Sequence, residues 1–147
     1  SRLFGIDLDH IDCAGVKLTL YKLFKLGSRG ELYQKTKNLP KYIEIPCRGN
    51  LYFLEPGPYL VKYNEYIRIP NGYIGLAIQR SSLIRMGTTL YTAVWDPGYK
   101  GRGSGLIVVY NPYGIVLEKN TQLAQLILIK MSRETKKIYQ GSYLGEK

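Results

Sequence analysis

Apolar residues in this chain occur in short runs separated by glycine, proline and asparagine, a pattern typical of β proteins with tight turns. The runs at residues 51–54 and 59–63 flank Pro56-Gly57-Pro58 and so predict strand, turn and strand. The run at 66–69 meets the turn signal Pro70-Asn71-Gly72, because asparagine and glycine tolerate positive φ. Further strands are predicted at residues 74–78, 88–95, 106–110, 115–117 and 123–131. We therefore expect an all-β sandwich, jelly roll or barrel.

Three segments depart from the strand pattern. Residues 81–86 predict one short helix, with a serine able to cap its start. Residues 28–41, which contain three lysines, one glycine and one asparagine, predict a long surface excursion. Residues 132–147 mix charge with tyrosine and glycine and lack the apolar content that would hold them on a core. We expect a single β domain at residues 1–131 followed by a mobile C-terminal arm at 132–147.

Composition places the chain among ordinary globular proteins. It has 147 residues, 45% hydrophobic and 22% charged, and a chain of this length buries about 68–70% of its unfolded surface without disulfide or metal staples. No apolar run approaches the roughly 20 residues that cross a bilayer, and the N-terminus lacks the apolar stretch of a signal peptide. Two cysteines are too few for a disulfide framework. We predict a soluble, cytoplasmic protein with no membrane partner.

Charge and residue usage narrow the chemistry. Lysine and arginine number 21 against 11 acidic residues, a net charge of +10, which attracts nucleic acid, an acidic membrane surface or a triphosphate, unless it is simply a solvated basic surface. His10 is the one histidine, which argues against Ser-His-Asp or Cys-His catalysis and against a His/Cys zinc site. The glycines at 98–105 match neither a phosphate-binding P-loop nor a dinucleotide-binding loop.

Three polar segments interrupt the apolar pattern and are candidates for chemistry. In residues 79–85, two serines at a helix start lie between Arg80 and Arg85, which suits a polyphosphate or an ordinary helix start. In residues 92–101, Asp96 follows an apolar strand, where it could take a proton from water, bind a metal or only bond to its own turn. In residues 120–129, Gln125 sits within an apolar strand and needs a partner, either a ligand or the backbone.

Taken in order, these segments resemble the superfamily of dUTPases and dCTP deaminases, and most closely its archaeal dUTPase branch. The resemblance extends from Gly15 to near the end of the chain and rests on five ordered motifs: residues 54–61, 80–83, 92–99, 123–126 and 139–143. It implies a distorted jelly-roll (β-clip) homotrimer with active sites between subunits. It also implies hydrolysis of dUTP to dUMP and pyrophosphate with Mg²⁺.

The resemblance also assigns roles to residues. Asp96 would activate the water that attacks the α-phosphate. Mg²⁺ would be carried mainly by the triphosphate, with no direct protein ligand. The residues that would bind substrate are the phosphate contacts Arg80, Ser81, Ser82 and Arg85; Gln125, at a phosphate or the water shell of the metal; the base-reading backbone of Ala93, Val94 and Trp95; Tyr99 against the deoxyribose; and Tyr139 or Tyr143 of the arm near the base or sugar.

General physical chemistry is consistent with these roles. Hydrolysis of a phosphoanhydride depends mainly on positioning and on stabilising the charge that develops on phosphate. Backbone donors and acceptors separate uracil from cytosine because the two bases present reversed edges, and the wrong base leaves buried groups unpaired.

Two departures from the superfamily pattern bear on function. A deaminase would carry a glutamate in the strand after the glycine hairpin, but residues 103–110 contain no carboxylate, and the tail reads Gly141-Ser142-Tyr143-Leu144 where deaminases tend to read Gly-Lys-Tyr-Gln. Both differences favour the dUTPase. Residues 14–19, Ala-Gly-Val-Lys-Leu-Thr, resemble the first motif of the family, Ala-Gly-Val-Asp-Leu-Thr. Here Lys17 replaces a family acid associated with the water shell of the metal, which reverses the local charge.

The leading hypothesis is therefore a homotrimeric dUTP diphosphatase that binds dUTP and has no stable nucleic-acid partner. Lys17 and the positive charge favour one alternative, a weak or silent nucleotide-binding regulatory relative. A dCTP deaminase is a further alternative. The basic, aromatic segment around Tyr99, Lys100 and Arg102 would suit a barrel that binds single-stranded nucleic acid.

Overall fold

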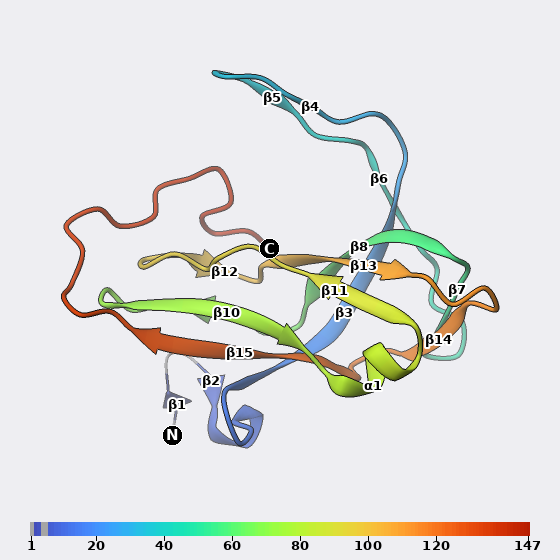
Figure 1. The fold of residues 1–147 in the computed structure, drawn as a ribbon, viewed down its shortest axis with the longest axis horizontal. Coiled ribbons are helices and arrows are strands. Elements are labelled where there is room, and N and C mark those ends of the chain that lie inside the picture. Colours follow the sequence, from blue (N-terminus) through green and yellow to red (C-terminus); the bar gives the residue numbers. More distant parts are fainter. Residues whose placement is uncertain (1, 4–5) are drawn as a thin grey trace.

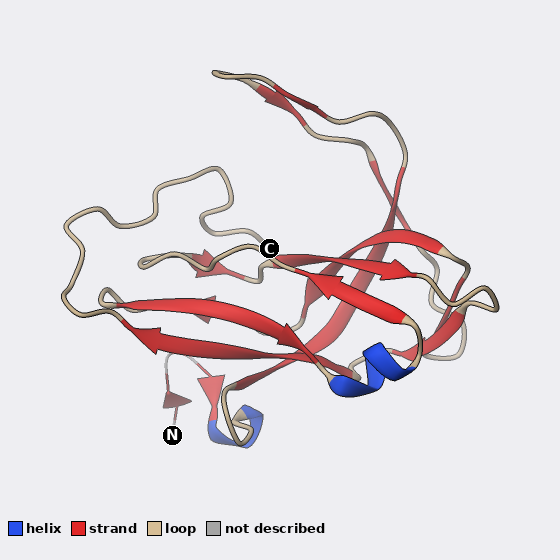
Figure 2. Cartoon of the chain, viewed as in Figure 1, coloured by secondary structure: helices blue, strands red, loops and turns tan. Residues whose placement is uncertain are grey.

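The computed structural model describes residues 2–3 and 6–147, with side chains from residue 6 onward. Its regular secondary structure is almost entirely antiparallel strands (Figures 1 and 2). The main sheet has the order β10 (Tyr73–Gln79), β15 (Gln122–Lys130), β3 (Val16–Leu26), β8 (Gly57–Tyr63), β13 (Ser104–Val109) and β11 (Thr88–Tyr91), and β6 (Tyr42–Glu44) pairs with the far end of β3. This architecture confirms the all-β prediction.

Four smaller pairs of strands and two short helices complete the described fold. The pairs are β1 (Arg2–Leu3) with β2 (Ile6–Asp7), β4 (Glu31–Leu32) with β5 (Lys37–Asn38), β7 (Leu51–Leu54) with β14 (Ile115–Glu118), and β9 (Ile67–Arg68) with β12 (Lys100–Gly101). The helices are the 3-10 turn η1 (Leu8–His10) and α1 (Ser81–Arg85). In the part of the chain that the structure describes, no helix could cross a membrane.

The two edge strands of the main sheet curl toward each other and nearly close it into a barrel. Gly75 and Trp95 exchange backbone hydrogen bonds of 2.8 and 2.9 Å. The side chain of Gln79 accepts a 2.6 Å bond from the backbone N–H of Leu90. These contacts fix the segment that follows β11 against β10, so residues 92–95 are an irregular stretch with one bridge rather than the continuation of the strand predicted at 88–95.

The core lies between the curled walls of this sheet. Side chains with no exposed surface come from all four central strands, among them Leu20 on β3, Val61 on β8, Ile107 on β13 and Leu126 on β15. Alternate residues of these strands point inward because successive side chains of a strand lie on opposite faces.

Strand β3, the longest of the described strands, was missed by the sequence analysis. Its residues alternate until Leu20, and the next buried residue is Leu23 rather than residue 22. A β-bulge between Leu20 and Lys22 shifts the register with β8 and accounts for the change of phase.

The short helix was predicted at the right place but with the wrong cap. The N-cap residue is Arg80, which makes no capping bond through its side chain. Ser81 is the first helical residue, and its hydroxyl accepts a 3.1 Å bond from the guanidinium of Arg85.

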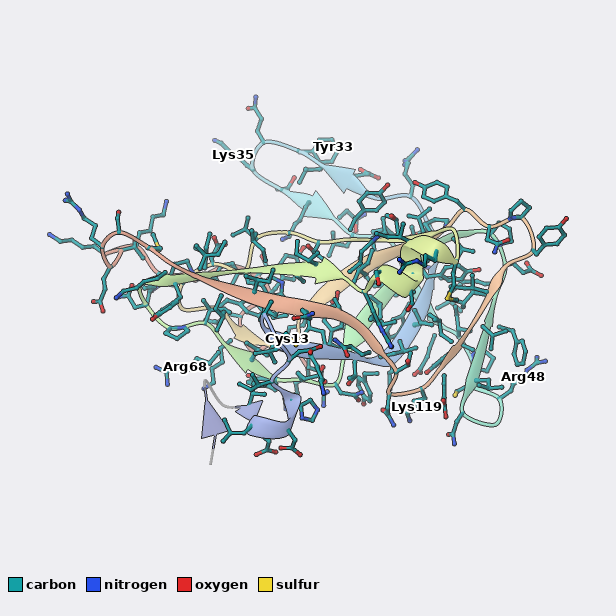
Figure 3. All side chains as sticks on the ribbon, turned by 60° about the horizontal axis from the view of Figure 1, so that its bottom comes forward. Cys13, Tyr33, Lys35, Arg48, Arg68 and Lys119 are labelled. Atoms are coloured by element: carbon teal, nitrogen blue, oxygen red, sulfur yellow. The ribbon has the colours of Figure 1, made fainter. Side chains whose placement is uncertain are left out.

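The predicted surface excursion is a hairpin that projects from the body beyond the paired ends of β3 and β6 (Figure 1). Tyr33 and Lys35 lie at its outer end (Figure 3). Most of its side chains are exposed, including Leu32 with 84% of its surface accessible.

Candidate functional site

The turn after the bridge at Trp95 is held by backbone bonds to the strand β9 region. Gly98 donates to the carbonyl of Ile69 at 2.9 Å, and Ile69 donates to the carbonyl of Tyr99 at 2.9 Å. Gly98 has φ of +83°, a conformation that favours glycine. The turn therefore holds Asp96 in a fixed backbone frame with an exposed carboxylate.

A cavity of about 640 Å³ opens beside this turn. Its size lies within the range of small-molecule sites, about 300–1,000 Å³. Seven of the residues predicted for the site line it: Ala93, Val94, Trp95, Asp96, Tyr99, Tyr139 and Tyr143. Eight further lining residues were not predicted from the sequence: Phe24, Leu39, Tyr42, Leu60, Lys62, Gly103, Ser104 and Glu146.

Aromatic rings form one wall of the cavity. The Trp95 and Tyr99 rings meet edge to face with centroids 5.4 Å apart, and Tyr99 meets Tyr139 in the same way at 5.4 Å. A Cβ atom on Gly103 would lie only 2.3 Å from the Trp95 ring. Glycine at 103 therefore lets the tryptophan take its place in the wall.

Ala93 and Val94 line this cavity, and their backbone groups have no partner in the part of the chain that the structure describes. Among the described residues, none donates to or accepts from the N–H and C=O groups of these two positions. Thr92, just before them, bonds through its hydroxyl to the carbonyl of Ala77 at 3.1 Å. Unpaired but fixed backbone groups of this kind can recognise the edge of a planar ligand.

The phenol of Tyr99 lies in a buried, acidic environment. Burial raises the pKa of Tyr99 above its ordinary value, and the nearby Glu146 carboxylate raises this pKa further. The hydroxyl of Tyr99 donates a 3.4 Å hydrogen bond to that carboxylate.

The C-terminal arm returns across the cavity. Glu146 forms a 2.8 Å ion pair with Lys62, and both side chains are less than one-fifth exposed. Its carboxylate also accepts a 2.9 Å bond from Ser104. Gly145 donates to the carbonyl of Lys100 at 2.6 Å.

These contacts correct one expectation for residues 132–147. The sequence analysis assigns the arm no apolar anchor, and this is wrong for Tyr139, which is half-buried against the core. The error arises because an isolated tyrosine carries no periodic signal, while its ring finds a partner only once Tyr99 is in place.

The phosphate residues predicted from sequence lie elsewhere on the chain. None of Arg80, Ser81, Ser82, Arg85 and Gln125 lines the cavity. They gather instead where β10 runs into α1 beside β15: Arg80 donates its backbone N–H to Leu123 at 2.7 Å, two residues from Gln125. One chain therefore presents two separate parts of the predicted site.

Gln125 has hydrogen-bond and register partners within the protein, because residues 14–19 lie next to it. Its side-chain oxygen accepts a 3.3 Å bond from the backbone N–H of Ala14, and its register partner on β3 is Lys17. The Lys17 ammonium lies 3.5 Å from the carbonyl of Asp9. A cation thus occupies the strand position next to Gln125.

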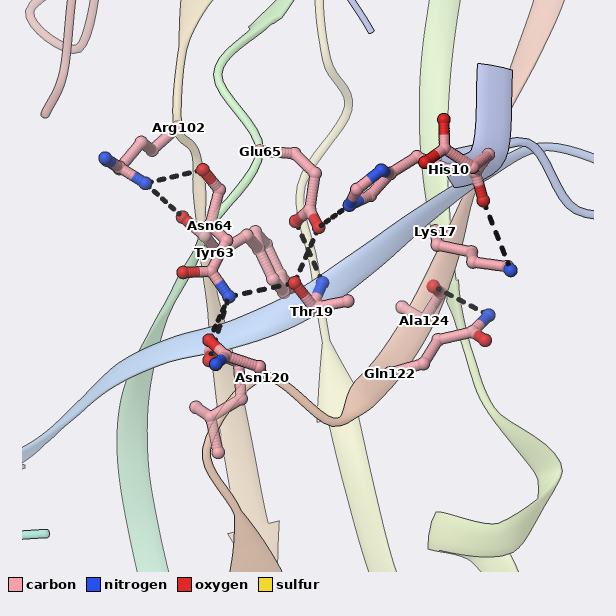
Figure 4. A network of polar contacts seen from close by, with 12 residues as sticks. His10, Lys17, Thr19, Tyr63, Asn64, Glu65, Arg102, Asn120, Gln122 and Ala124 are labelled. Carbon is pink, nitrogen blue, oxygen red and sulfur yellow. Dashed lines mark hydrogen bonds and ion pairs between the residues drawn. The ribbon is translucent and has the colours of Figure 1, made fainter. Parts of the chain in front are cut away.

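His10 takes part in a polar network under β3 (Figure 4). Glu65, 5% exposed, accepts bonds from the backbone and hydroxyl of Thr19 at 2.8 and 2.6 Å. His10 lies 3.6 Å from the same carboxylate, and Asn64 extends the network by bonding to Thr19 at 2.9 Å. These satisfied contacts indicate a structural role for the network.

The described residues contain no group of three or more His, Cys, Asp or Glu side chains that could hold a metal ion. Asp96 is the one carboxylate of the turn itself. This donor set does not fit a metal chelated by one chain.

Comparison with known sequences identifies the family. A family model described as dCTP deaminase-like matches residues 4–131. The chain belongs to the dCTP deaminase-like family. Within it, the probable deoxyuridine 5′-triphosphate nucleotidohydrolase of Aeropyrum pernix is 41% identical over 98% of this chain and 93% of that protein. Further archaeal chains named deoxyuridine 5′-triphosphate nucleotidohydrolases, most with the word probable, are 38–45% identical.

Solved structures confirm the fold of this dCTP deaminase-like protein. The 2′-deoxycytidine 5′-triphosphate deaminase of Agrobacterium tumefaciens matches with a TM-score of 0.65 at 19% identity, over 84% of this chain and 40% of that one. The EIAV dUTPase matches with a TM-score of 0.51 at 16% identity, over 82% and 98% of the two chains. The predicted jelly-roll fold of the superfamily is confirmed.

Proposed function

We propose that the protein is a dUTP diphosphatase, which hydrolyses dUTP to dUMP and pyrophosphate. One observation carries the proposal: the exposed carboxylate of Asp96 lies on the wall of a nucleotide-sized cavity beside Trp95 and the unpartnered backbone of Ala93 and Val94. The names of archaeal relatives at 39–45% identity over at least 96% of the chain support it.

Asp96 would act as the general base. Its carboxylate would orient a water molecule and accept a proton as the water oxygen attacks the α-phosphorus. The bond from this phosphorus to the bridging oxygen of the β-phosphate then breaks, and pyrophosphate leaves. The hydrogen-bonded turn fixes the position of this base relative to the water molecule. In phosphoryl transfer this positioning matters more than the strength of the base.

The free backbone groups of Ala93 and Val94 would read the uracil. The N–H and C=O of Trp95, which the sequence also predicted for this role, are already bonded to Gly75. Cytosine reverses the donor and acceptor pattern at this edge, so it would leave buried groups unpaired. Tyr99 would lie against the deoxyribose, and Tyr139 and Tyr143 of the arm would close over the base or sugar.

Arg80, Ser81, Ser82, Arg85 and Gln125 would bind the phosphates, and they would do so in the site of a neighbouring copy. Their position supports this proposal, because none of the five residues lines the cavity of the same chain that contains Asp96. A closed ring of identical subunits brings such separated patches together at each interface. We propose the homotrimer that the superfamily resemblance implies.

Mg²⁺ would enter with the triphosphate. When bound there it spreads the charge that builds on the phosphates during hydrolysis. Gln125 would contact its water shell. Lys17, in register with Gln125, places a fixed positive charge where the family has an acid, and would take over part of this charge stabilisation.

Residues 1–131 would form the nucleotide-hydrolysing domain and residues 132–147 the arm that covers it. The family match ends at residue 131, which supports this division. A cytoplasmic location is proposed because Cys13 and Cys47 are free and exposed, as suits a reducing compartment. We propose no stable nucleic-acid partner.

The deciding experiment supplies each deoxynucleoside triphosphate with Mg²⁺ and measures pyrophosphate and ammonia. Pyrophosphate from dUTP alone is the expected result. If dUTP quenches the fluorescence of Trp95 but no product forms, the protein is instead a silent nucleotide-binding relative. Oligonucleotide binding that weakens steeply with salt, without a response to dUTP, would replace both with a nucleic-acid-binding barrel.

One observation favours a second candidate, deamination of dCTP. Strand β13 carries no carboxylate of its own, but Glu146 reaches it from the arm and accepts a bond from Ser104 at 2.9 Å. The carboxylate is already paired with Lys62, which makes it a poor proton shuttle. Ammonia released from dCTP would establish this second activity, and its absence leaves Glu146 as an anchor of the arm.

A further inference from the structure

The hairpin of residues 27–42 is an ordered element joined firmly to the body. At its base, Gly27 donates to the carbonyl of Lys41 at 2.7 Å, and the backbone of Lys41 donates to the Ser28 hydroxyl at 2.8 Å. At its tip, Tyr33 donates to the carbonyl of Thr36 at 2.8 Å. Bonds at both ends give the hairpin a defined position relative to the sheet.

The base of the hairpin lines the cavity that contains Asp96. Leu39 and Tyr42 both contribute to its wall, together with Phe24 of β3. The Tyr42 ring meets that of Phe24 edge to face at 6.4 Å. Leu39 and Tyr42 remain 45% and 40% exposed, so a ligand in the cavity would find uncovered apolar surface on this side.

Lys37 joins the hairpin to the C-terminal arm. Its ammonium lies 4.3 Å from the centroid of the Tyr143 ring and 3.2 Å from the Tyr143 hydroxyl. The two residues are 106 positions apart in sequence. Burial raises the pKa of Tyr42, and the nearby Tyr143 and Glu146 raise it further, consistent with the arm lying close to the hairpin base.

Three side-chain contacts thus hold the arm between its middle and its end. Tyr139 packs on Tyr99 at the middle of the arm, Glu146 pairs with Lys62 at its end, and Lys37 contacts Tyr143 between them. The first two contacts fix the arm to the barrel, while the third fixes it to the hairpin across the mouth of the cavity.

We propose that the hairpin forms a wall of the nucleotide pocket and that Lys37, a positioning residue, holds the hairpin to the arm through its contact with Tyr143. This contact between Lys37 and Tyr143 is called the latch below. The proposal rests on the proposed function of the cavity, because the pocket closed in this way is the one assigned to dUTP. Leu39 and Tyr42 would then form the wall opposite the Asp96 turn. Lys37 and Tyr143 contact each other, so loss of the latch is expected to weaken the binding of substrate and transition state alike.

The test begins with the variant Lys37→Met, which removes the cation and keeps the length of the side chain. The KM for dUTP is expected to rise about two- to fivefold, the equivalent of an exposed cation–π contact, while kcat stays unchanged. Lys37→Arg keeps a cation that stacks on aromatic rings and should restore the wild-type KM. Lys35→Met removes the same charge at the exposed tip and should change nothing.

A second measurement needs no nucleotide. Trp95 is the one tryptophan of the chain and lines the cavity, so quenching of its fluorescence by acrylamide reports how well the arm covers the pocket. Lys37→Met and Tyr143→Leu should each increase quenching. The double variant should match the single variants, because both remove the same contact.

The outcomes separate the latch from the function. Unchanged KM and quenching in Lys37→Met, equal effects of Lys35→Met and Lys37→Met, or additive effects in the double variant would each overturn the latch. A wild-type protein that hydrolyses no dUTP would overturn the proposed function, while increased quenching in Lys37→Met would still establish the latch.

Discussion

At the residue scale, the chemistry proposed for the cavity depends on the carboxylate of Asp96. Asp96→Asn keeps the size of the side chain and removes the proton acceptor, so kcat for dUTP should fall about 10²- to 10⁴-fold. The binding of dUTP, followed by Trp95 fluorescence, should change little. Pyrophosphate release under saturating dUTP is the measurement.

The matched control for this variant is Glu118→Gln on β14, an exposed carboxylate outside the cavity. It should keep wild-type turnover. If Asp96→Asn retained full activity, the carboxylate would be serving only its own turn and the proposed base would be wrong.

Gly103 offers a second prediction at this scale. Its φ is +73°, and a Cβ there would lie 2.3 Å from the Trp95 ring. Gly103→Ala should lower the free energy of unfolding for two reasons. Crowding of the new Cβ against Trp95 should cost about 1–3 kcal/mol, and the left-handed backbone conformation should cost a further ~1–2 kcal/mol. Urea unfolding measures both.

Gly49→Ala separates these two causes. Gly49 has φ of +56° and open space around it, so its variant should show the backbone cost alone. Equal losses in the two variants would contradict the crowding against Trp95.

At the element scale, the stability of the barrel depends on the inward positions of β3. Leu20 has no exposed surface, whereas Leu26 at the end of the same strand is 42% exposed. Leu20→Ala should lower the free energy of unfolding by about 2–5 kcal/mol, and Leu26→Ala by no more than about 0.5 kcal/mol. Comparable losses would place Leu26 in an interface that the isolated chain leaves open.

Element positions were mostly predictable from sequence, but their connections in space were not. The strands near 74–78, 106–110 and 115–117 and the helix near 81–86 follow from local runs of residues. Strand β3 was missed because its bulge breaks the alternation, and the end of β11 was misplaced because Trp95 pairs with Gly75 of a distant strand. Both depend on tertiary contacts.

At the scale of the whole molecule, the arm should control access to the cavity. Deleting residues 138–147 removes Tyr139, Tyr143 and Glu146 together, so turnover of dUTP should fall while the oligomeric state stays the same. Pyrophosphate release measures the turnover, and light scattering measures the oligomeric state. Full activity in the truncated protein would refute a covering role for the arm.

A mixing experiment tests whether sites are shared between subunits. Asp96→Asn and Arg85→Ala should each be nearly inactive when alone. In trimers assembled from equal amounts of both, about one quarter of the sites would combine an intact Asp96 with an intact Arg85 from different subunits, and activity should return to that extent. No recovery would mean that each chain completes its own site.

The sequence by itself determined the all-β class and the short helix, and it supplied the motif residues of the two predicted site clusters, because turn signals, apolar runs and ordered motifs are local properties. Only the tertiary structure decided which of those residues share a cavity. It separated Asp96 from the α1 cluster, and it brought Lys62, Leu39 and Glu146 to the cavity wall. The reason is physical: these contacts join residues from the hairpin, β8 and the arm, whose proximity is set by strand pairing and by the path of the chain across the barrel.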